Sequence, residues 1–438
     1  MDGLFAGYMA ALGQTEWLPK QKLEQYQRSL VARVVRHAYD NVPFYRERLA
    51  CLIGADGAVD LARWDEVPVL RRKEAAADSA RMRVTQLPDY YGPIVDYATT
   101  GSSGVPLDFS ANGMVLTTSN AGLTRLAAWF GADTSKPLAR IRVYRDAEEI
   151  RYPEGATSKG WSRASPEAEV YDLDLLTPTD RQLEWLMRRR APYLMSSASN
   201  LAGIAHIMSP AQARALNIKL VFGIAETITA HAREIVAQRM GARIAGIYSC
   251  QEVGHIAHEC PQHGHYHVFA ENMLVEILDD ASRPTPPGEL GQVVLTSLYN
   301  YATPFIRYAI GDVAVRSDEP CPCGRALPVL AEVHGRTRSG FLFRDGTRVW
   351  PRFWHARKMR AFVPFREFQL VQTDFETVEF RYVPDEKESP ADFAGLRNFI
   401  ATHLHASVTT RIIAVPEVEK GPGGKFEHFI SLVTPPRA

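Results

Sequence analysis

Apolar and polar positions follow a helical period in the first part of the chain. Between residues 22 and 49, in KLEQYQRSLVARVVRHAYDNVPFYRERL, apolar side chains recur every three or four positions until Asn41, Val42 and Pro43 interrupt the pattern. This spacing gathers apolar residues on one face of a helix, and proline stops such a helix. We therefore predict mainly helical structure over the first hundred residues, with a break near residue 41.

From about residue 137 the pattern changes to short β-rich runs separated by helical segments. The runs are LARIRVY, EAEVYDL, IKLVF, RIAGIY, MLVEIL and GQVVLTSL, and the helical segments include residues 180–190 and 229–240. Strands that alternate with helices are typical of an α/β domain with parallel strands. We expect such a domain here, followed by a more antiparallel stretch after residue 270.

A second boundary falls near HGRTRSGFLFRDGTRVWP. Beyond it come two strand-like runs, FREFQLVQTD and ETVEFRYVP, a helix over residues 391–405 and a last strand, TTRIIAV. Together they would form a compact α+β unit of about 100 residues. The predicted organisation is a large domain of residues 1–338 and a small one of residues 339–438.

Composition and charge restrict the classes of partner. Lys+Arg and Asp+Glu both total 50 of 438 residues, so no net basic charge would attract nucleic acid or anionic lipid. The N-terminal residues have no basic region before an apolar segment, and charges interrupt them too early for a membrane span. Five unevenly placed cysteines favour reduced thiols or a metal over a disulfide framework. We expect a cytoplasmic protein without nucleic-acid or membrane partners.

The stretch YATTGSSGVPLDFS is rich in glycine and hydroxyl groups. A loop with few bulky side chains can turn its backbone N–H groups toward an anion such as phosphate. It differs from the P-loop of many ATPases, because Val105 follows Gly104 and no Gly-Lys-Ser/Thr is present. An ordinary turn is the alternative interpretation.

Six segments occur in an order that is informative as a set: TTGSSGVP, FGIAET, YSCQEVG, FIRYAIGD, HGRTRSGFLF and GPGGKFEHF. In order and separation they resemble the core motifs of adenylate-forming enzymes, most of all the phenylacetate–CoA ligase branch with its coenzyme F390 synthetase-like relatives. The resemblance implies an α/β fold with a large N-terminal adenylate-forming domain of βαβ sheets plus a β-rich subdomain, and a small mobile α+β C-terminal domain. It also implies that ATP activates a carboxylic acid as an acyl-adenylate with release of pyrophosphate, before the acyl group passes to a nucleophile.

The resemblance assigns nucleotide-binding residues. The loop that would cover the β- and γ-phosphates consists of Thr99, Thr100, Gly101, Ser102, Ser103 and Gly104. Val105 replaces the usual lysine, so this loop lacks a charge. Ala225 and Glu226 would lie beside adenine, Tyr248 would stack near it, and Asp312 would accept hydrogen bonds from the ribose hydroxyls.

Three residues are assigned to catalysis by the same resemblance. Glu252 would hold Mg²⁺, Arg336 would contact ribose or phosphate at the domain junction, and Lys425 would reach the α-phosphate when the small domain closes. Arg307 is expected to orient its loop rather than to touch substrate. For Glu226 and Glu252, a place at the start of a surface helix is the alternative.

The acid and the acceptor are less closely defined. An aromatic acid is expected, with a flat pocket lined by Tyr144, Tyr193, Ser196, Ser197 and Ala198. CoA is the expected acceptor, but Ser339 at the hinge departs from the family. An amine, a hydroxyl, a carrier-protein thiol, adenylyl transfer of the F390 synthetase type and a non-catalytic scaffold stay open, and a homodimer is compatible with the sequence.

A second metal site is predicted apart from these motifs. HECPQHGHYHV and CPCG contain thiols and imidazoles in the ligand types of a closed tetrahedral zinc site. Buried thiols with solvated histidines are the alternative. The predicted ligands of a structural Zn²⁺ are Cys321, Cys323 and Cys260, with His267 or His265 as the fourth.

Overall fold

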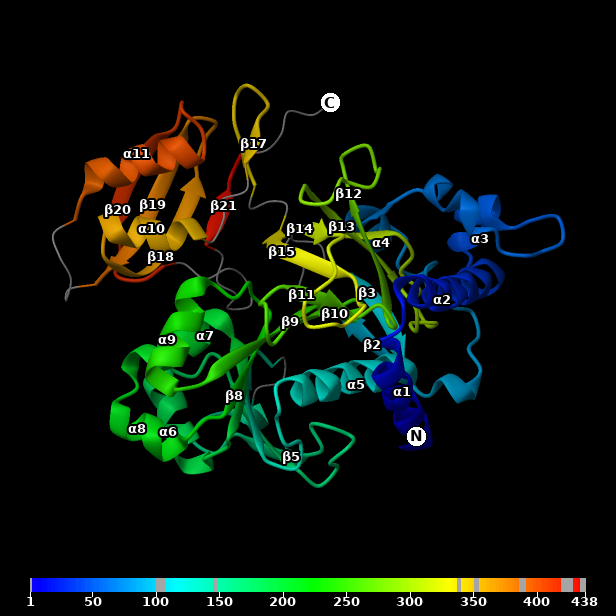
Figure 1. Ribbon diagram of the computed structural model, residues 1–438, viewed down its shortest axis with the longest axis horizontal. Helices are drawn as coiled ribbons and strands as arrows, with labels where there is room; N and C mark the ends of the chain where they lie inside the picture. The colour runs from blue at the N-terminus through cyan, green and yellow to red at the C-terminus, as the bar shows by residue number, and fades with distance from the viewer. Residues whose placement is uncertain are drawn as a thin grey trace.

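The computed structural model of the chain (Figure 1) describes residues 2–99, 107–144, 148–336, 340–349, 354–385, 391–418 and 428–433. Its helices are α1 (Asp2–Thr15), α2 (Lys20–Asn41), α3 (Tyr45–Arg48), α4 (Arg72–Ala77), α5 (Gly113–Trp129), α6 (Thr179–Arg189), α7 (Ala198–Ile207), α8 (Pro210–Leu216), α9 (Ala230–Met240), α10 (Trp354–Phe362) and α11 (Phe393–His403). Among these described helices, none has both the length and the apolar character that a membrane span requires.

The strands before residue 270 are β1 (Leu70–Arg71), β2 (Ile94–Ala98), β3 (Asp108–Asn112), β4 (Leu138–Arg142), β5 (Ala156–Lys159), β6 (Glu169–Asp174), β7 (Tyr193–Ser197), β8 (Leu220–Ile224), β9 (Arg243–Cys250), β10 (Gly254–Glu259) and β11 (Tyr266–Val268). Later strands are β12 (Met273–Leu278), β13 (Leu290–Ser297), β14 (Tyr308–Ser317), β15 (Val329–Arg336), β16 (Phe341–Leu342), β17 (Arg348–Val349), β18 (Phe365–Gln372), β19 (Thr377–Pro384), β20 (Thr409–Ala414) and β21 (Phe429–Ser431).

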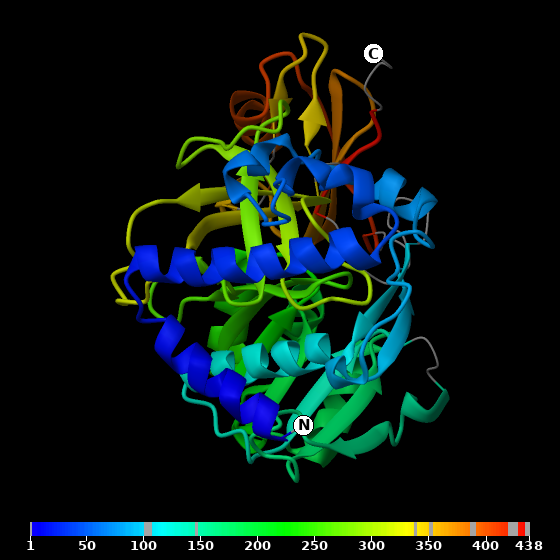
Figure 2. The same ribbon diagram turned by 90° about the vertical axis from the view of Figure 1, so that its right-hand side faces the viewer.

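The N-terminal region is mainly helical, as the apolar period predicts. Helix α2 lies across one side of the molecule in Figure 2 and ends just before Val42, where the sequence predicts a break. Its buried residues share the inward face: Leu23, Leu30, Val31, Val34, Val35 and Ala38. The prediction misses two strands in the first hundred residues, β1, which pairs with β14, and β2, which pairs with β3. Strand β1 has two residues, and its partner β14 lies far along the sequence. Strand β2 pairs with the nearby β3, but none of its residues is buried, so its sequence lacks the alternation that marks a half-buried strand.

One large sheet forms the centre of the molecule. Its order is β12-β13-β14-β15-β11-β10-β9-β8-β7-β4-β6-β5, with β1 added beside β14. The part from β6 through β4, β7 and β8 to β9 is parallel, whereas β12 to β15 pair antiparallel. This arrangement confirms the predicted α/β class and the antiparallel pairing after residue 270, although antiparallel pairing already begins between β9 and β10. The switch in strand order beside β4 is the kind of place where α/β sheets bind ligands.

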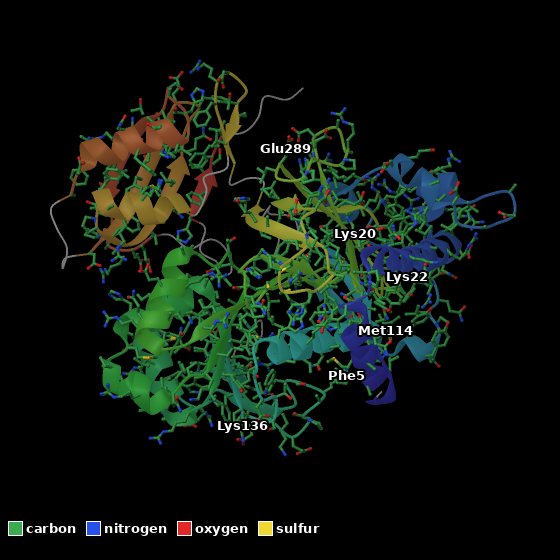
Figure 3. All side chains as sticks on the ribbon, in the orientation of Figure 1. Phe5, Lys20, Lys22, Met114, Lys136 and Glu289 are labelled. Atoms are coloured by element: carbon green, nitrogen blue, oxygen red, sulfur yellow. The ribbon has the colours of Figure 1, made fainter. Side chains whose placement is uncertain are left out.

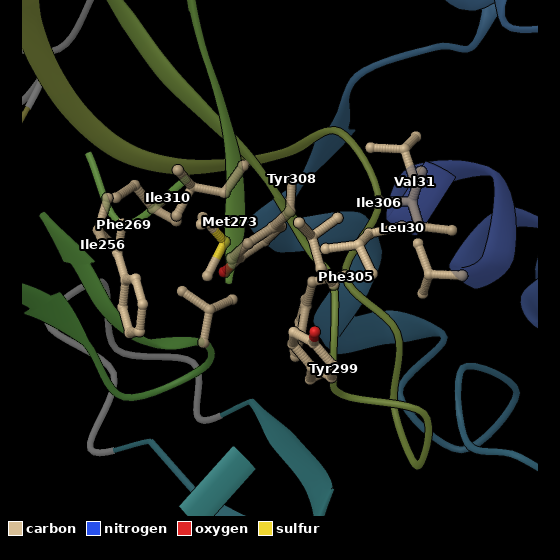
Figure 4. Close-up of a cluster of buried hydrophobic side chains, with 14 of the residues drawn as sticks. Leu30, Val31, Ile256, Phe269, Met273, Tyr299, Phe305, Ile306, Tyr308 and Ile310 are labelled. Atoms are coloured by element: carbon tan, nitrogen blue, oxygen red, sulfur yellow. The ribbon is translucent and has the colours of Figure 1, made fainter. Parts of the chain in front are cut away.

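Helices cover the sheet and close the main core. Phe5 on α1 and Met114 on α5, labelled in Figure 3, mark two helices that pack together. Figure 4 shows side chains from distant segments meeting in the core, including Leu30, Ile256 and Tyr308. Burial of such side chains contributes about 1.5–3 kcal/mol each, which stabilises the packing of these segments around one core.

The described C-terminal residues form a separate four-stranded sheet. Its order is β20-β19-β18-β21, and α10 and α11 pack with it around their own hydrophobic core. Figure 1 shows this unit beside the helices that cover the parallel strands, and α10 contacts α9. The observed β18, β19, α11 and β20 lie within two residues of the predicted segments at each end.

Candidate active site and metal cluster

Asp312 and Tyr248 come together from two strands. The Tyr248 hydroxyl on β9 donates a hydrogen bond of 2.9 Å to Oδ2 of Asp312 on β14. Gly311 has a φ of +84°, a conformation that glycine adopts without strain. Asp312 pairs across the ladder with Arg336 of β15. Three predicted nucleotide residues therefore lie close together on the sheet, although the Arg336 side chain is outside the described part.

Glu252 is held in the turn between β9 and β10. Its carboxylate Oε1 accepts 2.6 Å from Nη1 of Arg72 and 3.3 Å from the Tyr308 hydroxyl. The Glu252 side chain is only 8% exposed, so it is not the surface helix starter considered above. Burial, followed by the charge of Glu252, raises the pKa of Tyr308, so this phenol stays protonated and donates.

Thr99 marks the base of the predicted phosphate loop. Its N–H donates to the Leu107 carbonyl over 3.0 Å, and Leu107 N–H donates to the Thr99 hydroxyl over 3.1 Å. These two bonds join the chain on either side of the loop. The remaining predicted loop residues, Thr100, Gly101, Ser102, Ser103 and Gly104, lie outside the described residues, so their role stays a prediction.

Arg72 is the residue at this site that the sequence did not single out. Its Nη2 donates to the Thr99 hydroxyl while its Nη1 pairs with Glu252. One guanidinium thus connects the loop base with the predicted Mg²⁺ ligand, and it adds a cation beside a loop that has Val105 in place of lysine. The triplet of basic residues at positions 71–73 gives no local signal that selects its middle member.

Ala225 and Glu226 lie at the carboxyl end of β8. Ala225 has a φ of +65°, which turns the chain sharply after the strand. The Glu226 carboxylate accepts from the Ser199 N–H at 2.9 Å and from the Ser199 hydroxyl at 3.0 Å. The carboxylate is therefore engaged at the first turn of α7, a helix N-terminus where negative charge is favourable. The predicted place of Ala225 and Glu226 beside adenine stays a prediction.

The expected acid pocket is only partly supported by side-chain positions. Tyr144 lies just beyond β4, and its hydroxyl donates a hydrogen bond to the Asp172 carboxylate. Burial raises the pKa of Tyr144 to about 12. Ser196 is fully buried and donates to the Ile141 carbonyl, whereas Ser197 and Ala198 lie at the carboxyl end of β7. For Tyr193 the prediction is wrong. It is the first residue of β7, so it lies at the opposite end of the strand from Ser197, where it packs in the core and accepts a hydrogen bond from the Asp133 N–H.

Arg307 has the supporting role that was expected. It is 1% exposed, pairs with Oε1 of Glu276 over 3.1 Å and donates to the Val67 carbonyl over 2.7 Å. Those contacts join the segment before β1 to β12. Arg307 itself directly precedes β14, the strand that carries Asp312. Lys425 and Ser339 lie outside the described residues, and their roles stay predictions.

Cysteine and histidine side chains gather at the opposite end of β10 from Glu252. Cys260, His265, His267 and Cys321 offer ligand atoms that all lie within 4.8 Å of one another. The two sulfurs are 3.8 Å apart, and His265 Nε2 lies 3.1 Å from the Cys321 sulfur. A tetrahedral zinc with Zn–S bonds of about 2.3 Å has an S···S edge of about 3.8 Å. Cys323 is adjacent, with its sulfur 3.3 Å from His267 Nε2.

The electrostatics of this cluster suit a cation. Burial raises the pKa of Cys321 to about 12, so its sulfur becomes a thiolate at neutral pH only beside a positive charge. Burial, with a contribution from His265, lowers the pKa of His267 to about 4 and keeps it neutral. A neutral imidazole and a thiolate are the forms that bind zinc.

Comparisons with known proteins find a short family model within the chain and similar ligases along most of its length. A zinc-knuckle family model matches residues 248–262, which here form part of β9, a turn and β10 and contribute Cys260 to the cluster. The phenylacetate-coenzyme A ligase of Thermus thermophilus is 25% identical over 453 residues, covering 96% of this chain and 98% of that protein. The Pseudomonas putida phenylacetate-coenzyme A ligase is 24% identical over 355 residues, covering 78% and 76%.

Solved structures of 2-hydroxyisobutyryl-CoA ligase share the fold. In the postadenylation state with 2-HIB-AMP the TM-score is 0.76 at 17% identity, with 96% of this chain and 91% of that chain covered. In the thioesterification state with CoA the TM-score is 0.63, with the same coverage. The resemblance read from the six motifs is thus confirmed: the chain has the fold of adenylate-forming CoA ligases and is similar along almost its whole length to phenylacetate–CoA ligases.

Proposed function

We propose that this protein is an AMP-forming acid–CoA ligase. It activates a carboxylic acid with ATP as an acyl-adenylate, releases pyrophosphate and transfers the acyl group to CoA. The similarity to phenylacetate–CoA ligases, over 96% of this chain, supports the reaction class. An aromatic acid is the proposed substrate, on the same basis.

The observation that carries the proposal is that two polar groups of residues lie on or beside strands β9 and β14. Tyr248 and Asp312 form one group, suited to grip a ribose through carboxylate and phenol oxygens. Arg72, Glu252 and Thr99 form the other, where a cation and a hydroxyl stand at the base of the phosphate loop. Adenylation brings two anions together, so it needs donors and cations that offset their repulsion.

Glu252 fits the proposed Mg²⁺ ligand. Its carboxylate oxygen is a hard donor, and in this structure a guanidinium balances its charge. When bound, Mg²⁺ neutralises phosphate charge at the reacting group. Arg72 can pair with either Glu252 or a phosphate oxygen, because its planar fork suits both. We infer that Arg72 supplies the positive charge that the loop lacks because Val105 takes the place of the usual lysine.

The proposed reaction assigns different roles to the two parts of the chain. Residues 1–338 hold the nucleotide and the acid, and residues 339–438 act as a lid that carries Lys425. Arg336, at the end of β15, stands at the junction between them. Closure of a small domain over a bound nucleotide excludes water and completes the catalytic site.

Pyrophosphate exchange tests the first half-reaction. Purified protein should exchange labelled pyrophosphate into ATP in the presence of benzoic, phenylacetic or anthranilic-type acids, and mass spectrometry should show a CoA thioester only when CoA is added. Products formed with an amine or hydroxyl in place of CoA would redirect the second step. Absence of exchange across a broad panel of acids would reject the proposed function.

We further propose that the Cys/His cluster holds a structural Zn²⁺. The ligand types and the 3.8 Å sulfur separation support zinc, and Cys260, Cys321, His265 and His267 form the first ligand set, with Cys323 beside it. All five cysteines are free, which suits a reducing compartment such as the cytoplasm. Metal analysis should find about one zinc per chain and much less in Cys321→Ser, whereas equal zinc in the matched variant Cys51→Ser and in Cys321→Ser would count against this site.

A further inference from the structure

Two histidines on β10 contact one another close to the active-site turn. His255 Nδ1 and His258 Nε2 are 2.9 Å apart, and their rings meet edge to face. Both rings face α5 at Gly122, where a Cβ atom would lie 3.1 Å from His255 Nδ1 and 3.0 Å from His258 Cε1. The pair therefore needs glycine on the helix, and nothing in the proposed reaction yet uses it.

The surroundings of His258 decide which nitrogens carry protons. His258 is fully buried, and its Nδ1 has no hydrogen-bond partner among the described residues. If Nδ1 carried the proton, a buried N–H donor would be left unpaired, which costs more than a bare ring lone pair. The proton of His258 therefore belongs on Nε2, which donates to His255 Nδ1. In neutral His255 the remaining proton must then sit on Nε2.

The Nε2–H of His255 is available to a ligand. His255 is half-buried, and its Nε2 makes no hydrogen bond within the described ranges and keeps some exposed surface. Ser119 on α5 offers a second polar group, since its hydroxyl lies 2.7 Å from the Cβ position of Gly254 and is likewise uncommitted within those ranges. A donor and a hydroxyl thus flank the first residue of β10.

This polar pair borders the proposed reaction site. His255 lies three residues after Glu252 and pairs across the strands with Ser249, the neighbour of Tyr248. The turn also contacts β2, because Gln251 Nε2 donates to the Ala98 carbonyl beside Thr99 over 3.4 Å. From there the chain passes through the phosphate loop and β3 into α5. His255 and Ser119 therefore border the turn that carries Glu252, at the edge of the proposed reaction site.

We propose that His255, with Ser119, is a specificity-determining residue that selects acids whose acyl part carries a hydrogen-bond acceptor, such as a hydroxyl group. The proposal rests on the proposed function and narrows its substrate class. A site built to donate a hydrogen bond rejects the analogue that lacks the acceptor, because its own donor is then left unpaired. The fixed tautomer makes the donor permanent rather than adaptable.

The protonation state of His255 agrees with this role. Burial of the ring, with a smaller contribution from the positive charge of Arg125, lowers the pKa of His255 to about 4. The ring is therefore neutral at ordinary assay pH. A neutral donor favours a hydroxyl or carbonyl acceptor on the acid and does not by itself select a second carboxylate.

Competition between matched acids provides the test. Pyrophosphate exchange is measured for hydroxybenzoic and hydroxyphenylacetic acids against the methyl acids substituted at the same position, because methyl has the size of hydroxyl without an acceptor. For at least one position, the wild-type kcat/KM should favour the hydroxy acid by about tenfold or more. The ratio should fall toward one in His255→Leu, fall partly in Ser119→Ala and be largely retained in His255→Gln, whose side-chain amide can donate from nearly the same place.

Controls separate the possible failures. The exposed histidine variant His206→Leu should keep the wild-type ratio, and thermal unfolding should show that each variant is folded. Histidine ¹⁵N spectra of wild type and His255→Leu should assign an Nε2-protonated ring to residue 255. Ratios near one for every wild-type pair, an unchanged ratio in a folded His255→Leu, or an Nδ1-protonated His255 would each overturn the inference. Absence of exchange with any acid would instead reject the proposed function.

Discussion

At the scale of single residues, Arg72 shows how one side chain can join separate motifs. It pairs with Glu252, donates to Thr99 and lies within 3.5 Å of the Tyr308 hydroxyl. A partly buried ion pair of this kind adds little stability by itself, because desolvation offsets the attraction. Its value lies in position, since it holds a cation where phosphate must bind.

Removing that cation should affect catalysis more than folding. Arg72→Ala is expected to lower kcat/KM for ATP by about 100-fold or more, and Arg72→Lys should restore part of it, because charge at a developing anion is worth about 2.7–4 kcal/mol. Arg71→Ala is the matched control, since Arg71 is exposed and bonds Gln292 on the sheet. Equal loss in both variants, or a normal rate in Arg72→Ala, would contradict the role. Steady-state exchange kinetics at varied ATP give the comparison.

Gly246 illustrates a residue fixed by close packing. A Cβ atom there would lie 2.6 Å from both Glu259 Oε2 and the Tyr266 hydroxyl, and Glu259 is held by two bonds from Arg233. Gly246→Ala should therefore destabilise the fold by about 1–3 kcal/mol. The control Gly13→Ala adds a methyl where no atom lies within 4 Å on helix α1 and should be neutral or stabilising. Thermal or urea unfolding of the two variants should show these opposite signs.

At the scale of elements, local pattern predicted what depends on neighbours in sequence. The parallel strands such as β4 and β8, and helix α9 with its Thr229 cap, follow from apolar runs and capping residues. Strand β1 was missed because its partner β14 is distant in sequence, and β2 was missed because none of its residues is buried. The motifs identified Asp312 and Glu252, but not Arg72 or the His255–His258 contact, whose significance appears only when separate strands and helices meet. Tyr193 was expected to line the acid pocket with Ser196, Ser197 and Ala198 because these residues are close in sequence, but it begins β7 and packs in the core.

The proposed zinc site should stabilise the strand ends that carry it. Its ligands join the end of β10, strand β11 and the loop between β14 and β15, while Tyr248, Glu252 and Asp312 lie away from these ends. Loss of zinc, by chelation or in Cys321→Ser, is expected to lower Tm by about 5 °C or more, because binding energy of the metal is folding energy. Re-addition of Zn²⁺ should restore the Tm of the chelated wild type but not of Cys321→Ser. A Tm that chelation leaves unchanged would contradict a structural role.

At the scale of the whole molecule, the small C-terminal sheet stands apart from the large one and touches it through α10 and α9. The fold agrees better with a postadenylation-state structure than with a thioesterification-state structure of the same ligase, with TM-scores of 0.76 and 0.63. Since these two structures are of one protein, the difference reflects how its parts are arranged. Rotation of a small unit as a rigid body about a hinge is a recognised way to pass between two such arrangements.

Lys425 should therefore matter for one half-reaction and not for the other. Lys425→Ala is expected to lower pyrophosphate exchange by about 100-fold or more, because its ammonium is the cation proposed to meet the α-phosphate. The same variant, given a chemically prepared acyl-adenylate and CoA, should form the thioester at close to the wild-type rate. In that step the thiol attacks the acyl carbon and AMP leaves, so no bond between phosphates is broken. Lys20→Ala, which removes an exposed lysine at the start of α2, should leave both rates unchanged. If Lys425→Ala slowed both half-reactions equally, the residue would serve the fold or CoA binding, and a lid that acts only during adenylation would be the wrong description of this chain.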